Sequence, residues 1–141
     1  MSVMNERKTN RIGIAVVEHQ RQFLIGVRDH STTLAGHHEF PGGKCEPGEA
    51  PDACAARECL EETGLSVRPA EELLYVEHAY DHADVLLHFW LCHPEPAAPA
   101  HLLTEDLKGF LWIPAEELPT LNFPAANAPL IDLLINAYVR S

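Results

Sequence analysis

The chain has 141 residues, 46% of them hydrophobic, which is enough for one globular domain with its own core. Its formal net charge of −11 opposes binding to DNA, RNA or an anionic membrane, because those surfaces are themselves negative. No stretch approaches the roughly 20 apolar residues of a membrane-spanning helix. We therefore expect a single soluble domain over residues 1–141, in which a metal ion would stand between the acidic protein and a small anionic substrate.

The first half of the chain indicates a hairpin, a loop and a helix. Arg11–Val17 and Gln22–Arg28 are rich in β-forming residues on either side of a polar turn, which predicts two paired strands. Asp29–His38 is predicted as a surface loop. A helix is predicted for Pro51–Thr63, because proline suits its first position and Gly64 suits a left-handed C-terminal cap.

The second half predicts three strands and a terminal helix. Leu73–Tyr80 and Asp84–His93 carry large β-forming side chains around a short turn, and Gly109–Ile113 forms a further short strand ended by Pro114. Apolar residues at helical spacing then predict a helix from about Ala128 to Arg140. Strands interrupted by two helices indicate an α/β fold with a mixed sheet between helical layers.

The predicted helix at Pro51–Thr63 has an acidic side. Glu58, Glu61 and Glu62 share one face at about 100° per residue, although like charges at this spacing destabilise a helix. A solvated acidic face is the ordinary explanation of such a cluster. Mg²⁺ is the alternative, because it prefers hard oxygen ligands and is usually shared with substrate phosphates. The core side of the helix is predicted to carry three apolar residues, Ala53, Ala56 and Leu60.

The segment from Gly43 to Leu65 favours the metal site. It resembles the Nudix box, G-x5-E-x7-R-E-U-x-E-E-x-G-U, in which U is aliphatic. The match fails only at the first U, where Cys59 stands as a small apolar substitute. The resemblance implies a Nudix α/β/α sandwich with a mixed sheet between helices. It also implies a nucleotide pyrophosphohydrolase that uses Mg²⁺, for which Mn²⁺ can substitute.

The same resemblance implies roles for individual residues. Arg57 orients the glutamates, and Glu49 and Lys44 support the site from the preceding loop. An acid from a later loop completes the site or takes the proton from water, and Glu105 and Asp106 are the candidates between which spacing does not choose. The implied metal site consists of the carbonyl of Gly42 and the side chains of Glu58, Glu61 and Glu62.

Beyond the box, the chain resembles the MutT branch of the family, whose members remove oxidised guanine nucleotides such as 8-oxo-dGTP. Glu39–Lys44 leads into the box as in that branch, and Phe123–Pro129 resembles its F-P-x-A-N-x-P segment. Asn127 then falls where the branch reads the purine edge. Its carboxamide offers both a donor and an acceptor to such an edge, although asparagine is also a favoured helix N-cap.

Three further residues are candidates for substrate binding. Phe40 and Tyr80 are predicted to flank the base, and Arg28 is predicted to reach a phosphate or the sugar. Each is equally suited to a structural role, because aromatic residues in strands usually pack in the core and an arginine at a strand end is usually solvated.

The cysteines and histidines add no metal motif. The four cysteines form no C-x-x-C pair, and the nine histidines show no ligand spacing such as H-E-x-x-H. The first ten residues are too polar for a secretory signal. We therefore predict reduced thiols and a cytoplasmic protein.

Three functions stay open. The first is hydrolysis of 8-oxo-dGTP or a related oxidised purine nucleotide to the monophosphate and pyrophosphate. The second is hydrolysis of another compound, such as CTP, a pterin triphosphate or a nucleotide sugar. The third is a non-catalytic nucleotide sensor, which the intact set of box glutamates disfavours. The expected partner is a small-molecule nucleotide, with no nucleic acid polymer or membrane, and the protein is expected to be a monomer or small homo-oligomer.

Overall fold

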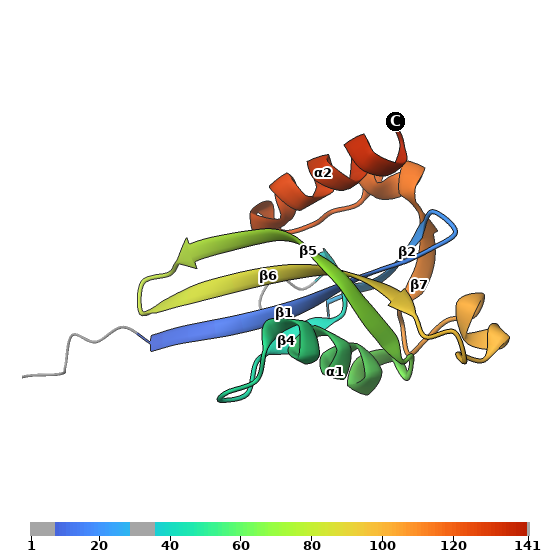
Figure 1. The fold of residues 1–141 in the computed structure, drawn as a ribbon. Helices are drawn as coiled ribbons and strands as arrows, with labels where there is room; N and C mark the ends of the chain where they lie inside the picture. Colours follow the sequence, from blue (N-terminus) through green and yellow to red (C-terminus); the bar gives the residue numbers. More distant parts are fainter. Residues whose placement is uncertain (1–7, 29–35, 141) are drawn as a thin grey trace, which may run out of the picture.

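The computed structural model describes residues 8–28 and 36–140 (Figure 1). Seven strands of this part form one mixed sheet with the path β3-β2-β1-β6-β5, to which β4 adds beside β1 and β7 beside β2. The strands are β1 (Lys8–His19), β2 (Gln22–Val27), β3 (His38–Glu39), β4 (Gly42–Lys44), β5 (Val67–Ala79), β6 (Ala83–Pro94) and β7 (Leu111–Pro114). The helices are α1 (Pro51–Thr63) and α2 (Ala128–Tyr138), with short 3₁₀ turns η1 (Ala100–Leu103), η2 (Ala115–Thr120) and η3 (Ala125–Asn127).

The central strand β1 makes the sheet mixed. It runs parallel to β6, with Gly13 opposite His88, and antiparallel to β2 and β4. The strands β5 and β6 form a long antiparallel hairpin at one side. The predicted mixed sheet is therefore confirmed.

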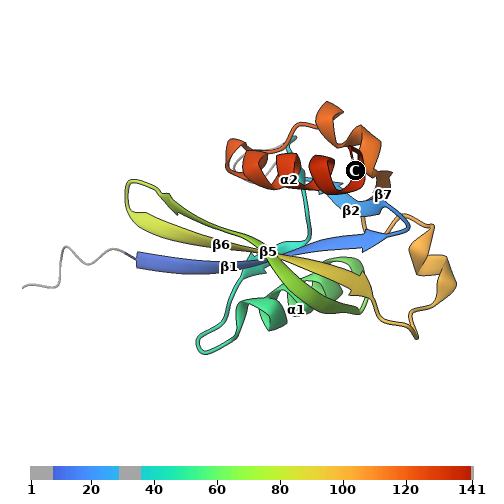
Figure 2. The same ribbon diagram turned by 45° about the horizontal axis from the view of Figure 1, so that its top comes forward.

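Helices cover both faces of the sheet, α1 on one and α2 on the other (Figures 1 and 2). Side chains alternate along β1, so Ala15 and Val17 join the core under α1 while Val16 joins the core under α2. Leu130 and Leu134 of α2 are fully buried in the second core. The architecture is the α/β/α sandwich that the sequence predicts.

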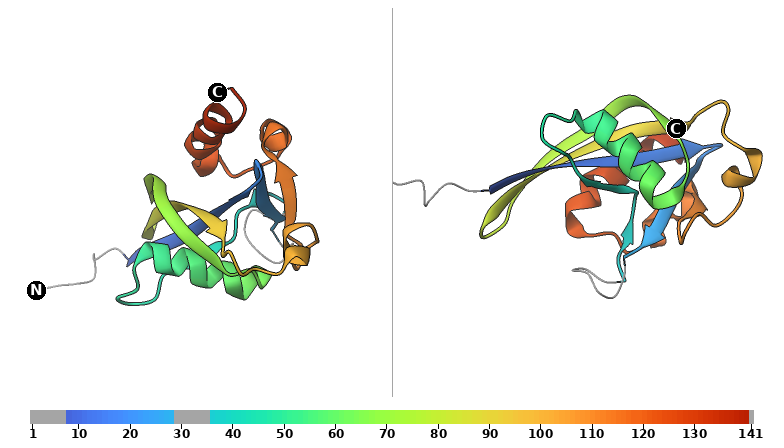
Figure 3. Two further views of the ribbon diagram at one scale, coloured as in Figure 1. Left: turned by 45° about the vertical axis from the view of Figure 1, so that its right-hand side comes forward. Right: turned by 90° about the horizontal axis from the view of Figure 1, so that it is seen from below.

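The helix α1 lies close against β1, as the view from below shows (Figure 3). The contact requires a glycine, because a Cβ on Gly13 would lie 2.6 Å from the Pro51 carbonyl oxygen and 2.8 Å from Cys54 Cβ. At its other end, Gly64 ends the helix with φ 81°, and its N–H donates to the Leu60 carbonyl. Both ends of α1 agree with the prediction.

The predicted core side of α1 is wrong. Ala53 is exposed and Leu60 is 48% exposed, and only Ala56 packs partly against the core. The sheet lies instead under the neighbouring face of the helix, so that the glutamates stand at the edge of the buried stripe rather than opposite to it. The buried residues of α1 are Cys54, Ala55, Cys59 and Thr63.

Other differences concern strand limits. The strand β5 begins at Val67, six residues before the predicted start, although Pro69 lies within it and the register shifts twice. An edge strand tolerates proline, because its outer N–H groups need no partner in the sheet. The very short β3 and β4 were not predicted. Most of the predicted loop Asp29–His38, residues 29–35, lies outside the described residues, and His38 begins β3.

Within the described part of the chain, none of the helices is long and apolar enough to span a membrane.

Candidate metal and nucleotide site

Two of the predicted metal ligands, Glu58 and Glu62, turn from α1 toward the glycine-rich strand β4. The N–H of Gly42 donates to Oε1 of Glu62 at 3.3 Å. The carboxylate of Glu58 lies against Gly43, where an added Cβ would be 2.4 Å from the carboxylate carbon. A side chain at position 43 would therefore displace Glu58, which is why glycine is required there.

The environment of Glu62 disfavours an isolated negative charge. Burial raises the pKa of Glu62, and the neighbouring carboxyl groups of Glu58 and Glu39 raise it further, while the hydrogen bond from Gly42 opposes them. The negative charges of Glu58 and Glu39 thus both act on Glu62. Such crowding of carboxylates is relieved when a cation binds between them.

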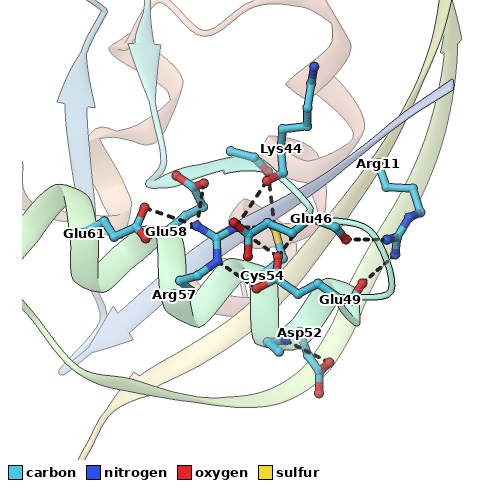
Figure 4. Close-up of polar contacts among 11 residues, drawn as sticks. Arg11, Lys44, Glu46, Glu49, Asp52, Cys54, Arg57, Glu58 and Glu61 are labelled. Atoms are coloured by element: carbon cyan, nitrogen blue, oxygen red, sulfur yellow. Dashed lines mark hydrogen bonds and ion pairs between the residues drawn. The ribbon is translucent and has the colours of Figure 1, made fainter. Parts of the chain in front are cut away.

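Arg57 connects the preceding loop to the acidic face of the helix (Figure 4). Its guanidinium binds Glu49 through two bonds, Nε to Oε2 at 2.7 Å and Nη2 to Oε1 at 2.9 Å. The remaining nitrogen, Nη1, donates to Glu58 Oε2 at 3.1 Å and to Glu61 Oε2 at 3.1 Å. The hydrogen bond from Arg57 holds the pKa of Glu49 at about 2. Arg57 is thus placed to orient two of the box glutamates.

The third predicted ligand, Glu61, lies farther out. Its side chain is 57% exposed and contacts Nη1 of Arg57. Among residues 8–28 and 36–140, no three His, Cys, Asp or Glu side chains gather closely enough to hold a metal ion. An exposed side chain changes rotamer at little cost, so Glu61 can turn toward Glu58 and Glu62 without disturbing the core.

The available donors fit a hard divalent cation. They are carboxylate and backbone carbonyl oxygens, which Mg²⁺ prefers. The backbone beside them is tightly packed, because a Cβ on Gly42 would lie 2.7 Å from the Gly13 carbonyl oxygen of β1 and a Cβ on Gly43 would lie 2.4 Å from the Glu58 carboxylate. Cys54 is close by, with Sγ donating to the Gly43 carbonyl at 3.4 Å, but magnesium avoids sulfur.

Lys44 and the later acids contact other groups. The carbonyl of Lys44 accepts a bond from Arg57 Nη2 at 3.2 Å, while its side chain extends away from Arg57 (Figure 4). Asp106 accepts a bond from the Gly109 N–H at 2.7 Å, which fixes the turn before β7. Glu105 lies beside it at a surface hollow. Neither acid makes a hydrogen bond to a box glutamate within the part of the chain described here.

The predicted base-binding residues fall in different surroundings. Phe40 is 5% exposed and stacks on Phe123, with ring centroids 5.2 Å apart and planes at 13°. Tyr80 is 49% exposed and lies in the turn between β5 and β6, with its ring centroid 4.5 Å from that of His78. Phe40 therefore belongs to the core beneath α2, and Tyr80 lies at the surface.

Arg28 and Asn127 are the more polar candidates. Arg28 follows β2, and its Nη1 lies 3.8 Å from Oε1 of Glu39. Asn127 precedes α2 but has a helical backbone, φ −86° and ψ −6°, and its side chain makes no capping hydrogen bond. The alternative of a helix-capping role for the Asn127 carboxamide is thus not what the structure shows.

Two residues that sequence reasoning missed also belong to the surroundings of the site. Burial raises the pKa of Glu39, and the positive charge of Arg28 opposes this rise. The charge of Glu39 in turn raises the pKa of Glu62. Its position just before the glycine-rich loop was the available signal. Arg11 of β1 binds the loop between β4 and α1, 35 and 38 residues away, and no local pattern in the sequence indicates such a contact.

Comparison with known proteins agrees with this geometry. The NUDIX domain family matches residues 13–133. The 8-oxo-dGTP diphosphatase of Haemophilus influenzae is 28% identical over 93% of this chain and 95% of its own length. The CTP pyrophosphohydrolase of Escherichia coli is 26% identical over 84% of this chain and 85% of its own length.

Solved structures agree as well. The E. coli ORF135 protein has a TM-score of 0.73 at 22% identity and covers 99% of this chain and 97% of its own, a likeness of fold. MutT from methicillin-resistant Staphylococcus aureus 252 has a TM-score of 0.73 at 25% identity, over 93% and 98% of the two chains. Fold and relatives together define a pyrophosphohydrolase that acts on nucleotides. The chain belongs to the NUDIX domain family, whose hydrolases generally use divalent metal ions.

Proposed function

We propose that this Nudix hydrolase converts 8-oxo-dGTP, or a related oxidised purine nucleoside triphosphate, into the monophosphate and pyrophosphate with Mg²⁺. The observation that carries the hydrolytic part is the packing of Glu58 and Glu62 against the Gly42–Gly43 backbone. This arrangement gathers carboxylate oxygens beside two consecutive glycines, whose backbone a phosphate can approach closely. Relatives named 8-oxo-dGTP diphosphatase support the choice of substrate.

In this proposal the metal is held by Glu58, Glu61, Glu62 and the Gly42 carbonyl. A bound divalent cation neutralises the phosphates, activates water and stabilises the leaving oxygen. The protein contributes the fixed positions of the acids: Arg57 restrains Glu58 and Glu61, and the Gly42 N–H restrains Glu62. Mn²⁺, which also accepts oxygen ligands, is expected to replace Mg²⁺.

The base is assigned to the surface near the start of α2. The Asn127 carboxamide makes no capping bond, and we propose that its donor and its acceptor bind a purine edge. Arg28 and Tyr80 have partly exposed side chains and are the proposed contacts to phosphate or sugar and to the base. Phe40 is buried and would act through its stack with Phe123. The proton acceptor is proposed to be Glu105, Asp106 or a box glutamate.

CTP is the second candidate substrate. The relative from Escherichia coli named CTP pyrophosphohydrolase is 26% identical, close to the 28% of the Haemophilus influenzae diphosphatase. The same metal site would serve either triphosphate, since it meets the phosphates and not the base. Only the residues around the base distinguish the two substrates.

The metal site is tested by Glu58→Gln and Glu62→Gln, which preserve side-chain size but remove the charge. We expect kcat for pyrophosphate release to fall by at least about 100-fold, because electrostatic groups in such sites are typically worth that much. Circular dichroism should be unchanged, since both side chains lie at the edge of the buried stripe. Glu116→Gln, which removes an exposed carboxylate in η2, is the matched control. Full activity in both site variants would contradict the assignment.

A further inference from the structure

We propose that Arg11 is a positioning residue of the metal site, acting through the turn between β4 and α1. The inference rests on the proposed function, because the site it positions is the one assigned there. Arg11 lies in β1, on the face of the sheet that α1 covers, and the hydrogen bonds of its side chain go to the carbonyls of Glu46 and Glu49 rather than to the predicted metal ligands. Its effect would pass through Glu49 and Arg57.

The Arg11 side chain holds the turn at both ends (Figure 4). Its Nη1 donates to the carbonyl of Glu49 at 2.7 Å, and Nη2 donates to the carbonyl of Glu46 at 3.1 Å. The Arg11 carbonyl accepts a bond from the Cys45 N–H at 2.8 Å, one residue before the turn. A single residue of β1 therefore fixes the exit from β4 and the entrance to α1. A planar guanidinium can satisfy two separate carbonyls, whereas an ammonium is a point charge.

The turn itself is compact but exposed. The Glu49 N–H donates to the Glu46 carbonyl at 2.9 Å, across Pro47 and Gly48, and Gly48 has φ 77°. The Glu46 N–H donates to Oε1 of Glu49 at 3.0 Å. These bonds define the shape of the turn but do not attach it to the sheet. Attachment to β1 comes from Arg11 and from the Cys45 N–H.

The position of the turn reaches the site through two charged groups. The Glu49 carboxylate takes two bonds from Arg57, and Arg57 also binds Glu58 and Glu61. If the turn moves, Glu49 moves with it, and Arg57 loses the partner that determines the direction of its guanidinium. The carboxylates would then be less well ordered for a metal ion. Loss of a group that orients metal ligands typically costs about 10–100-fold in metal affinity or activity.

The test measures Mn²⁺ binding to the nucleotide-free protein by the loss of the free-ion EPR signal. For Arg11→Gln we expect an Mn²⁺ dissociation constant about 10-fold higher than in the wild type, at the lower end of the range for groups that orient ligands. We expect kcat to fall while KM for the nucleotide changes little, because the base contacts are untouched. Arg11→Lys keeps the charge but not the planar group that binds both carbonyls, so its Mn²⁺ dissociation constant should lie between those of the wild type and Arg11→Gln.

Arg21→Gln is the matched control. The Arg21 guanidinium also donates to a backbone carbonyl of a distant segment, that of Tyr138, but on the α2 side of the sheet. Its loss is expected to leave the Mn²⁺ constant unchanged. An unchanged constant in Arg11→Gln, an equal rise in Arg21→Gln, or wild-type binding in Arg11→Lys would each overturn the proposal. If the wild type and Glu62→Gln bind Mn²⁺ equally weakly, the proposed metal site itself fails, and the role of Arg11 fails with it.

Discussion

Arg57 binds the carboxylates of Glu49, Glu58 and Glu61. Among the described residues, it is the only cation that binds three carboxylates at the site. One positive charge cannot balance three negative ones, and Glu62 and Glu39 add further acidic groups nearby. The excess negative charge is the feature that a divalent cation would neutralise. The bidentate bond to Glu49 also shows why lysine would not replace Arg57, since it lacks the planar fork.

The base-reading residue gives a prediction at this scale. Asn127→Ala should lower kcat/KM for 8-oxo-dGTP by an amount corresponding to about 1–3 kcal/mol, because a polar edge of the base would be left unpaired. The ratio of kcat/KM for 8-oxo-dGTP to kcat/KM for dGTP should fall, while kcat should change less. Asn136→Ala, in the last turns of α2, is the control for effects on the helix. An unchanged preference together with a lower melting temperature would point to a structural role for Asn127.

The sequence placed Glu58, Glu61 and Glu62 on one helix, because the proline and glycine that begin and end α1 act locally. It did not place Arg11, because that contact joins segments 35 and 38 residues apart and depends on the register of β4 beside β1. Likewise, the burial of Phe40 follows from its stack with Phe123, a contact between distant segments.

At the scale of elements, the site depends on how closely α1 approaches the sheet. Gly13 lies opposite Gly43 in the antiparallel pair of β1 and β4, so both strands carry glycine where the helix and its glutamates pack. The helix ends were predictable, because proline and glycine act locally at the first turn and at the cap. The buried face of α1 was not, because a weakly amphipathic helix does not say which side the sheet covers. The start of β5 was missed because Pro69 and two register shifts interrupt its strand pattern.

Gly13→Ala tests this packing. The new methyl would meet the Pro51 carbonyl and the backbone nitrogen of Ala55 at 2.6 and 2.8 Å, so α1 would have to shift. Overpacking of this kind typically costs about 1–3 kcal/mol of unfolding free energy. Chemical denaturation measures it, with Thr9→Ala at an exposed position of the same strand as the control. Equal stability of Gly13→Ala and wild type would show that α1 does not pack on β1 as described.

For the whole molecule, the net charge of −11 makes the metal-free protein repel the triphosphate that it is proposed to bind. Divalent cations would remove part of this repulsion where it is strongest, at the edge of α1. The order of strands was not predictable from the sequence, because the parallel pairing of β1 with β6 joins residues about 75 positions apart.

Metal removal gives the prediction at this scale. A ligand that binds only the folded state stabilises it by about 2.7 kcal/mol at 100 times its dissociation constant. The melting temperature should therefore rise as Mg²⁺ is added after EDTA treatment. NaCl at equal ionic strength should produce only the smaller rise that comes from screening of the negative charges of the protein. The rise specific to Mg²⁺ should be smaller in Glu62→Gln. The same rise with NaCl would show that charge screening, rather than a metal site, is responsible.

The most direct test of the central claim is kcat/KM with Mg²⁺ for 8-oxo-dGTP, dGTP, CTP and ADP-ribose, with the products identified. We predict the highest value for 8-oxo-dGTP, with the monophosphate and pyrophosphate as products. A higher value for CTP or ADP-ribose would contradict the assignment of an oxidised purine nucleotide while leaving the Nudix chemistry. No turnover of any of the four would contradict the proposed reaction on these nucleotides.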